Sequence, residues 1–270
     1  MIVGIDFGIT NTDIAISDNS NSKFFSMPSK KINNDFLLEI FDFIQLNIDE
    51  VEKIAVTGGK SSNLNNSFKN IPIVKVNEID AIGYGAIELY GINNKPFVAI
   101  SSGTGTACIY HADKKFNHLG GISIGGGTLQ GLSNYIISTN KPSQIEKLAS
   151  SGKRESLDLL IGEAVNEIGS LYPEITASNF VKGKITKKHS SEDIAASLSN
   201  MIGEVIGTIS YLNALLCNEN KVYFLGRTSL NKVIKTAIED RLKLANISGV
   251  FKESREYGNV LGALRSIQSD

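Results

Sequence analysis

The chain of 270 residues carries 27 Lys and Arg against 28 Asp and Glu, a formal net charge of −1, and 41% of its residues are hydrophobic. This length and composition are typical of one or two ordinary globular domains and exclude a wholly disordered chain. The near-zero charge argues against a nucleic-acid-binding polycation, and two cysteines are too few for a disulfide framework or a four-thiolate zinc site.

The first third of the chain alternates short extended segments with helices. An acidic residue, Asp6, comes too early for a signal peptide, so we expect a cytoplasmic enzyme. Hydrophobic periodicity and turn residues predict the elements in order. The strands are expected at 1–7, 12–17, 22–26, 53–57 and 71–76, and the helices at 34–46 and 80–90.

The remainder repeats this order. Strands are expected at 97–101, 106–111, 115–118, 221–225 and 249–252, and helices through about 181 and at 190–217, 230–244 and 257–268. Two copies of strand–strand–strand–helix–strand–helix predict two α/β lobes. We place the N-terminal lobe at 1–93 and the C-terminal lobe at 94–270, joined near 92–95.

One long apolar stretch, 194–217, needs a membrane check. Glu204 interrupts it, so a membrane-spanning helix is not expected. Its apolar residues recur every three or four positions, which predicts a long buried helix in the core or at a dimer interface. Gly203 and Gly207 would let another backbone approach closely, within the subunit or across a dimer.

Each copy has a polar, glycine-bearing turn between its first two strands. The first contains Gly8, Thr10 and Asn11, and the second is Gly103-Thr104-Gly105-Thr106. Glycine leaves room for a ligand, and backbone N–H groups with Thr hydroxyls suit phosphate. Two tight hairpins would explain either turn alone, but two related turns in two repeats favour a phosphate clamp between the lobes.

Asp6 ends the first, largely apolar strand. Burying an acid there is costly without a cation or hydrogen bonds, and Mg²⁺ beside nucleotide phosphates would supply both. A turn cap is the alternative.

Two further glycine segments follow predicted strands. Gly125-Gly126-Gly127 is expected to open a helix and to present free N–H groups to a nucleotide, although a flexible turn would use the same residues. Gly226 ends the strand at 221–225, with Arg227 beside it as a cation.

Glu78 and Asp80 lie at the entry to the helix after the strand at 71–76. Both could cap the helix, since acids are favoured at a helix N-terminus. Asp80 fits that role well, whereas Glu78, at the expected cleft edge, is a candidate general base for phosphoryl transfer to an alcohol.

These motifs lie in segments that together resemble one family: 4–10, 56–59, 78–81, 103–106, 120–132, 152–154, 157–159, 176–180 and 262–264. They resemble type II pantothenate kinases, members of the superfamily that joins acetate and sugar kinases, heat-shock chaperone ATPases and actin. The resemblance runs nearly end to end. It implies the two-lobed actin-like ATPase fold, built from duplicated mixed-sheet βββαβα units.

The resemblance also implies an activity and a set of site residues. The expected protein is a homodimer that transfers the γ-phosphate of ATP, with Mg²⁺, to the terminal hydroxyl of pantothenate, the first step of coenzyme A synthesis. Glu78 would be the catalytic base, Asp6 would organise Mg²⁺, and Glu78, Thr104 and His118 would contact substrate. By matched position, the nucleotide phosphates would be lined by Gly8, Thr10, Gly103, Thr104, Gly105, Gly125, Gly126 and Gly127. From their places in the turns and after a strand, Asn11, Thr106 and Gly226 are also expected to bind the nucleotide.

Two positions differ from the family pattern. His118 stands where the family usually has a substrate-contacting arginine, and Asp13 stands where the first turn commonly ends in lysine. Two alternatives therefore stay open: a related kinase for another small hydroxyl compound, or a nucleotide-binding regulatory protein with weak transfer. Cys108 and Cys217 lack the setting of an iron–sulfur ATPase activator.

Overall fold

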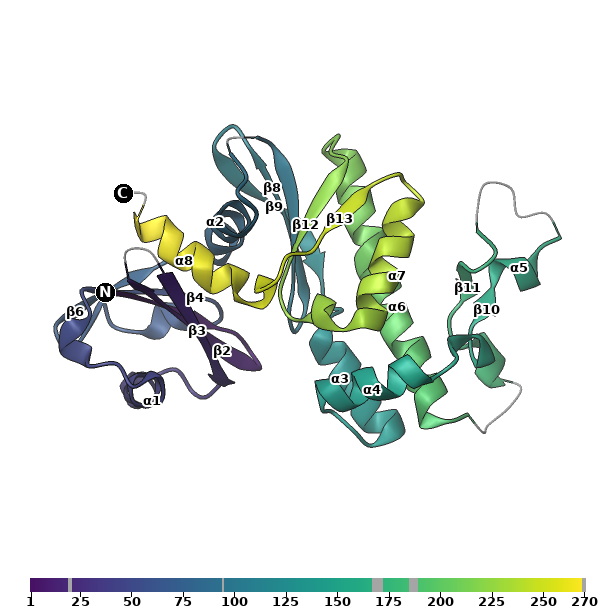
Figure 1. Cartoon of the computed structure of the whole chain (residues 1–270), viewed down its shortest axis with the longest axis horizontal. Helices are drawn as coiled ribbons and strands as arrows, with labels where there is room; N and C mark the ends of the chain where they lie inside the picture. The colour runs from purple at the N-terminus through teal and green to yellow at the C-terminus, as the bar shows by residue number, and fades with distance from the viewer. Residues whose placement is uncertain (19–20, 94, 167–171, 185–188, 269–270) are drawn as a thin grey trace.

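The computed structural model describes residues 1–18, 21–93, 95–166, 172–184 and 189–268 (Figure 1). The first half of the chain forms a six-stranded sheet in the order β3-β2-β1-β4-β6-β5. Its strands are β1 Ile2–Phe7, β2 Asn11–Asp18, β3 Asn21–Pro28, β4 Lys53–Thr57, β5 Ser67–Phe68 and β6 Ile71–Lys75. Strand β2 pairs antiparallel with both β1 and β3, and β4 and β6 continue the sheet parallel to β1.

The second half forms a five-stranded sheet in the order β13-β12-β7-β8-β9. Its strands are β7 Phe97–Ser102, β8 Thr106–Ala112, β9 Lys115–Ile122, β12 Lys221–Leu225 and β13 Ser248–Val250. Three antiparallel strands are again followed by two parallel ones. The predicted duplication of mixed α/β units is therefore confirmed by the strand pairing, while the proposed lobe boundary at 93/94 stays a prediction.

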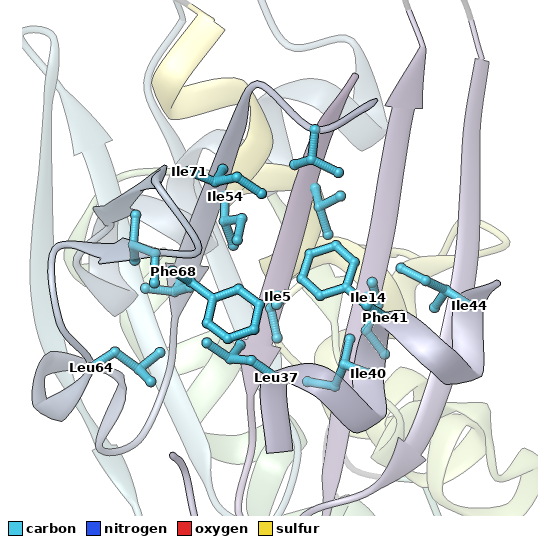
Figure 2. Packing of buried hydrophobic residues seen from close by; sticks show 14 of the residues in the cluster. Ile5, Ile14, Leu37, Ile40, Phe41, Ile44, Ile54, Leu64, Phe68 and Ile71 are labelled. Atoms are coloured by element: carbon cyan, nitrogen blue, oxygen red, sulfur yellow. The ribbon is translucent and has the colours of Figure 1, made fainter. Parts of the chain in front are cut away.

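Helix α1, Asn34–Ile44, covers one face of the first sheet (Figure 2). Leu37, Ile40, Phe41 and Ile44 are spaced three and four residues apart, so they share one side of the helix. They pack against strand residues such as Ile5, Ile14 and Ile54. Because successive side chains of a strand point to opposite faces of the sheet, every second residue of a strand lies on this face. This alternation turns Asp6 to the opposite face.

Helices α6 Ser191–Leu216 and α7 Lys232–Lys243 pack on the second sheet, and helices α3 Gly126–Ile137 and α4 Pro142–Ser151 pack against α6 in the same hydrophobic cluster. Helices α6 and α7 lie side by side, and a Cβ at Gly203 would stand 2.6 Å from the Cβ of Ala237. The glycines of α6 therefore serve a close helix contact within the same chain.

Helix α2, Glu78–Tyr90, and the last helix, α8, Gly258–Gln268, pack against each other between the two sheets (Figure 1). Helix α2 packs on the second sheet through Ile82 and Ala86, and α8 packs on the first sheet through Val260 and Leu264. The crossing is tight, because a Cβ at Gly262 would lie 1.8 Å from the carbonyl oxygen of Ala81. The first residues of both helices consequently reach the space between the lobes.

The segment between α4 and α6 differs from the helices expected through about 181. It contains a short two-stranded pair, β10 Leu159–Leu160 and β11 Thr176–Ser178, and the four-residue helix α5, Ile161–Ala164. Side chains hold it to itself and to α6: Arg154 donates to the Thr176 hydroxyl at 2.7 Å, and Asp158 accepts from the Phe180 N–H at 2.9 Å and from Ser197. Long-range polar contacts decide this segment, so local periodicity could not predict it.

The apolar pattern of α6 is divided between the core and the surface. Leu198 is buried, as expected, but Val205, Leu212 and Leu216 are 38%, 49% and 76% exposed. These residues are not buried within the single chain, because α7 packs on the side of Gly203 and Gly207, so burial of the whole pattern at a dimer interface stays a prediction. Among the described residues, no helix combines the length and apolar character needed to cross a membrane.

Candidate active site

A cleft of about 900 Å³ lies where strands of both sheets end. The turns after β1 and β7 and the segments after β4 and β12 all contribute to its lining. Mixed α/β sheets commonly bind ligands at the carboxyl ends of their strands. Every residue assigned to the site from the sequence lines this cleft except Gly125.

The first glycine turn is held rigid from behind. The Ser29 hydroxyl donates to the carbonyl of Gly8 at 2.6 Å and is hydrogen-bonded to the Thr12 hydroxyl at 3.0 Å. Across the cleft, the hydroxyls of Thr10 and Thr104 are 3.2 Å apart. The two turns therefore face each other, with these two hydroxyls at hydrogen-bonding distance.

The second turn is fixed by the start of α3. The N–H groups of Gly126 and Gly127 donate to the carbonyls of Gly103 and Thr104 at 2.8 and 3.0 Å. The expectation that these N–H groups are free for a ligand is therefore wrong. A Cβ at Gly125 would lie 2.7 Å from the Thr104 carbonyl oxygen, so Gly125 supports the turn from beneath the cleft surface.

Gly226 supports the same turn from β12. Its φ is +87°, and a Cβ there would lie 2.3 Å from the carbonyl oxygen of Ser102. The next but one residue, Thr228, donates its hydroxyl to the Gly103 carbonyl at 2.7 Å. The glycine thus permits a close contact between the strand end and the second turn.

Asp6 lies at the end of β1, opposite Asp13 on β2 and Thr57 on β4. Burial, together with the negative charges of Asp13 and Glu78, raises the pKa of this carboxyl from 3.8 to about 7, although a hydrogen bond from Asn259 and the positive charge of Arg227 act in the opposite direction. A nearby cation would relieve this cost by favouring the ionised form.

A metal ion fits Asp6 only with ligands from outside the protein. No group of three or more His, Cys, Asp or Glu residues within the described part of the chain is arranged to hold a metal. Mg²⁺ commonly takes one or two carboxylates and completes its shell with phosphate oxygens and water. The donor set around Asp6 suits Mg²⁺ bound together with nucleotide phosphates.

Glu78 is the first residue of α2, and its side chain is exposed at the cleft. The helix is capped by Asn77, whose side-chain oxygen accepts from the Ile79 N–H at 2.8 Å. Asn77 therefore takes the N-cap position, while Glu78 and Asp80 lie in the first turn, where the helix dipole favours acids. The Glu78 carboxylate is therefore available to a ligand.

His118 lies on β9, opposite Ile109 on β8, and is exposed at the cleft. The strand runs past the expected end at 118 to Ile122, with an irregular register between Cys108 and Ile109. His118 and Thr104 line the same cleft as Glu78.

Sequence reasoning missed the pairing of Asp13 with Arg227. The guanidinium Nη2 donates to an Asp13 carboxylate oxygen and to the Ser26 hydroxyl, the latter at 2.7 Å. Arg227 also lies over the ring of Tyr257, 5.5 Å from its centroid. The signal in the sequence was a basic residue directly after the glycine at a strand end, but nothing local joined it to Asp13.

Two solved structures with the same fold contain a bound nucleotide analogue. An activator of 2-hydroxyisocaproyl-CoA dehydratase from Clostridium difficile, with bound ADPNP, matches 98% of this chain and 93% of its own with a TM-score of 0.68 and 15% identity. A ROK family glucokinase from Streptomyces griseus, in complex with glucose and AMPPNP, matches 100% and 99% with a TM-score of 0.63 and 11% identity. The two-lobed actin-like ATPase fold expected from the sequence is confirmed.

Sequence comparison gives the family. The family model described as Fumble matches residues 87–240. A type II pantothenate kinase from Bacillus anthracis is 31% identical over 97% of this chain and 96% of its own length, and one from Staphylococcus epidermidis is 26% identical over 98% and 99%. With more than half of its length in the family model and a relative matched nearly end to end, the chain belongs to the Fumble family of type II pantothenate kinases.

Proposed function

We propose that this protein transfers the γ-phosphate of ATP to the terminal hydroxyl of pantothenate and forms 4′-phosphopantothenate, the first product of coenzyme A synthesis. Family membership supports the acceptor, because the matched relatives are named for pantothenate. The observation that carries the chemistry is the cleft itself, in which two opposed glycine turns, Asp6 and Glu78 lie together. ATP as the phosphate donor favours action in the cytoplasm.

The residues of the cleft have separate roles in phosphoryl transfer. The hydroxyl oxygen of the acceptor attacks the γ-phosphorus, the bond from phosphorus to the β–γ bridging oxygen breaks, and ADP leaves. Glu78 accepts the proton that the hydroxyl loses. As a general base, its carboxylate has to lie within hydrogen-bonding reach of that hydroxyl. The turns around Thr10 and Thr104 hold the phosphates between the lobes.

Asp6 is the residue of this chain that would hold Mg²⁺. The ion would supply positive charge that neutralises the phosphate oxygens during transfer. The raised pKa of Asp6 supports this role, because an enclosed carboxyl with neighbouring carboxylates gains most from a cation.

His118 and Thr104 are proposed to contact the acceptor. Pantothenate carries a carboxylate, and a protonated imidazole binds a carboxylate better than a neutral one. Thr104 offers a hydroxyl at the boundary between the phosphate site and the rest of the cleft.

We also propose that the protein is a homodimer that buries the exposed apolar residues of α6. Val205, Leu212 and Leu216 are spaced seven and four residues apart on one helix, and exposed apolar patches of this kind mark protein interfaces. Leu212→Glu with Leu216→Glu should shift the mass measured by analytical ultracentrifugation from dimer to monomer. Leu38→Glu on α1, where the leucine is 36% exposed, is the control that should leave the mass unchanged.

The acceptor is tested by measuring ATP consumption with pantothenate, pantetheine and common sugars. Turnover with pantothenate, abolished or strongly reduced in Glu78→Gln, is the expected result. Turnover with sugars alone would contradict the proposed acceptor while retaining a kinase. ADP binding with no turnover on any acceptor would favour the regulatory alternative.

A further inference from the structure

Arg227 extends from the second sheet across the cleft to the first. It follows β12, and its guanidinium reaches Asp13 on β2 and Ser26 on β3. The ring of Tyr257 lies beside the same group. Gly226, with its close contact to Ser102, fixes the backbone from which Arg227 starts. The side chain is therefore held at both ends.

The charge balance of the cleft makes this residue unusual. Five carboxylates line the cleft: Asp6, Asp13, Glu78, Glu146 and Glu256. Among the described lining residues, Arg227 is the only lysine or arginine. A nucleoside triphosphate brings several further negative charges, so its phosphates need every cation that this surface offers.

The guanidinium also has unused donors. It carries five N–H groups, and those of Nη2 donate hydrogen bonds to Asp13 and Ser26. Nε and Nη1 donate to no residue in the described part of the chain, although the side chain is only 28% exposed and lines the cleft. One edge of the planar group is thus occupied by the first sheet, and its other donors remain for a ligand.

We infer that Arg227 contacts the phosphate chain of the bound nucleotide, with its guanidinium oriented for that contact by Asp13, Ser26 and Tyr257. Arginine suits the task, because its rigid fork of donors can bind a carboxylate and a phosphate oxygen at once. The same guanidinium would then connect the phosphates to strands β2 and β3 and draw the two lobes together. This inference rests on the proposed nucleotide site, but it is independent of the acceptor.

The experiment compares ADP with adenosine, which lacks the phosphates. Isothermal titration calorimetry measures both dissociation constants for wild type, Arg227→Gln and Arg227→Lys. Arg265→Gln removes an arginine from the exposed part of α8 and is the matched control. Loss of charge-assisted hydrogen bonds should weaken ADP binding by Arg227→Gln about 10–100-fold. Adenosine binding should stay within about threefold, and the control should bind both ligands as wild type does.

Arg227→Lys separates orientation from charge. Lysine keeps the cation but cannot hold Asp13, Ser26 and a phosphate together, so ADP affinity should fall severalfold with adenosine affinity unchanged. This variant decides the matter if Arg227→Gln does not fold. ADP affinity equal to wild type in the folded variants, or equal losses for ADP and adenosine, would overturn the inference.

The same measurements keep this inference apart from the proposed function. A wild-type protein that binds ADP but does not phosphorylate pantothenate loses only its acceptor assignment, and the ADP-to-adenosine comparison still decides the role of Arg227. A wild-type protein that binds neither ADP nor adenosine overturns both.

Discussion

Replacement of Asp6 by asparagine should stabilise the protein in the absence of metal, and increasingly so as the pH rises. Burial and two neighbouring carboxylates raise the folded-state pKa of Asp6 from 3.8 to about 7. The contribution of the protonated carboxyl to stability is therefore complete below pH 3.8 and is lost as the pH rises through about 7. Asparagine has no such ionisation and keeps a similar shape.

The size of this effect follows from the shift. At about 1.4 kcal/mol per pKa unit, a rise of roughly three units corresponds to a loss of about 4 kcal/mol at alkaline pH. Roughly 2–3 kcal/mol of this falls between about pH 5 and about pH 8. For a chain of this size, the melting temperature of Asp6→Asn relative to wild type should therefore rise by roughly 5–10 °C across that interval.

Differential scanning calorimetry with EDTA at the two pH values measures this difference. Asp42→Asn, at an exposed position on α1, is the control and should change stability by less than about 0.5 kcal/mol at either pH. A second series with Mg-ATP should reverse the order, because wild type gains a metal ligand that the variant lacks. A melting difference that is constant from about pH 5 to about pH 8 would refute the reasoning, since it would mean that Asp6 ionises as readily in the folded as in the unfolded chain.

Three further changes test the site and the fold. Glu78→Gln should lower turnover by about 10²–10⁴-fold while ADP affinity by calorimetry stays nearly unchanged, because only the proton acceptor is lost; nearly full turnover would remove Glu78 from the chemistry. His118→Arg should lower the pantothenate KM, because a guanidinium offers two aligned donors and a permanent charge to the pantothenate carboxylate; identical KM values for the two proteins would place His118 outside the acceptor site. Gly262→Ala should cost at least about 1–3 kcal/mol in urea denaturation, because its Cβ would meet the Ala81 carbonyl at 1.8 Å, whereas Gly131→Ala in α3, with open space around it, should be neutral or stabilising. Equal stability of the two glycine variants would mean that α2 and α8 separate at little cost.

The order of the elements could be predicted from the sequence because it depends on local geometry. Side chains alternate along a strand and recur every three to four residues along a helix, so the residues of α1 that face the core could be identified in advance. The two glycine turns were recognisable for the same reason, since each occupies the same place in its repeat. The family follows from these local motifs taken together, and the full-length relatives confirm it.

Contacts between distant parts of the chain could not be predicted in this way. Asp13, on the first sheet, pairs with Arg227, which lies 214 residues later in the chain. From the sequence alone, Asp13 could be interpreted only as the loss of a lysine that the family commonly has at this position. Likewise, the exposure of Leu212 and Leu216 depends on which side of α6 helix α7 covers.

The three glycines at the start of α3 show most clearly which features depend on the local sequence and which depend on the tertiary structure. Their sequence determined that a helix begins there and that its backbone can be closely approached. Only the tertiary structure decided what approaches: the second turn packs against them and takes the N–H groups of Gly126 and Gly127. A backbone donor bonds to whichever acceptor the fold brings within reach, and that acceptor is fixed by the packing of β7, β8 and α3 together rather than by the residues that carry the donor.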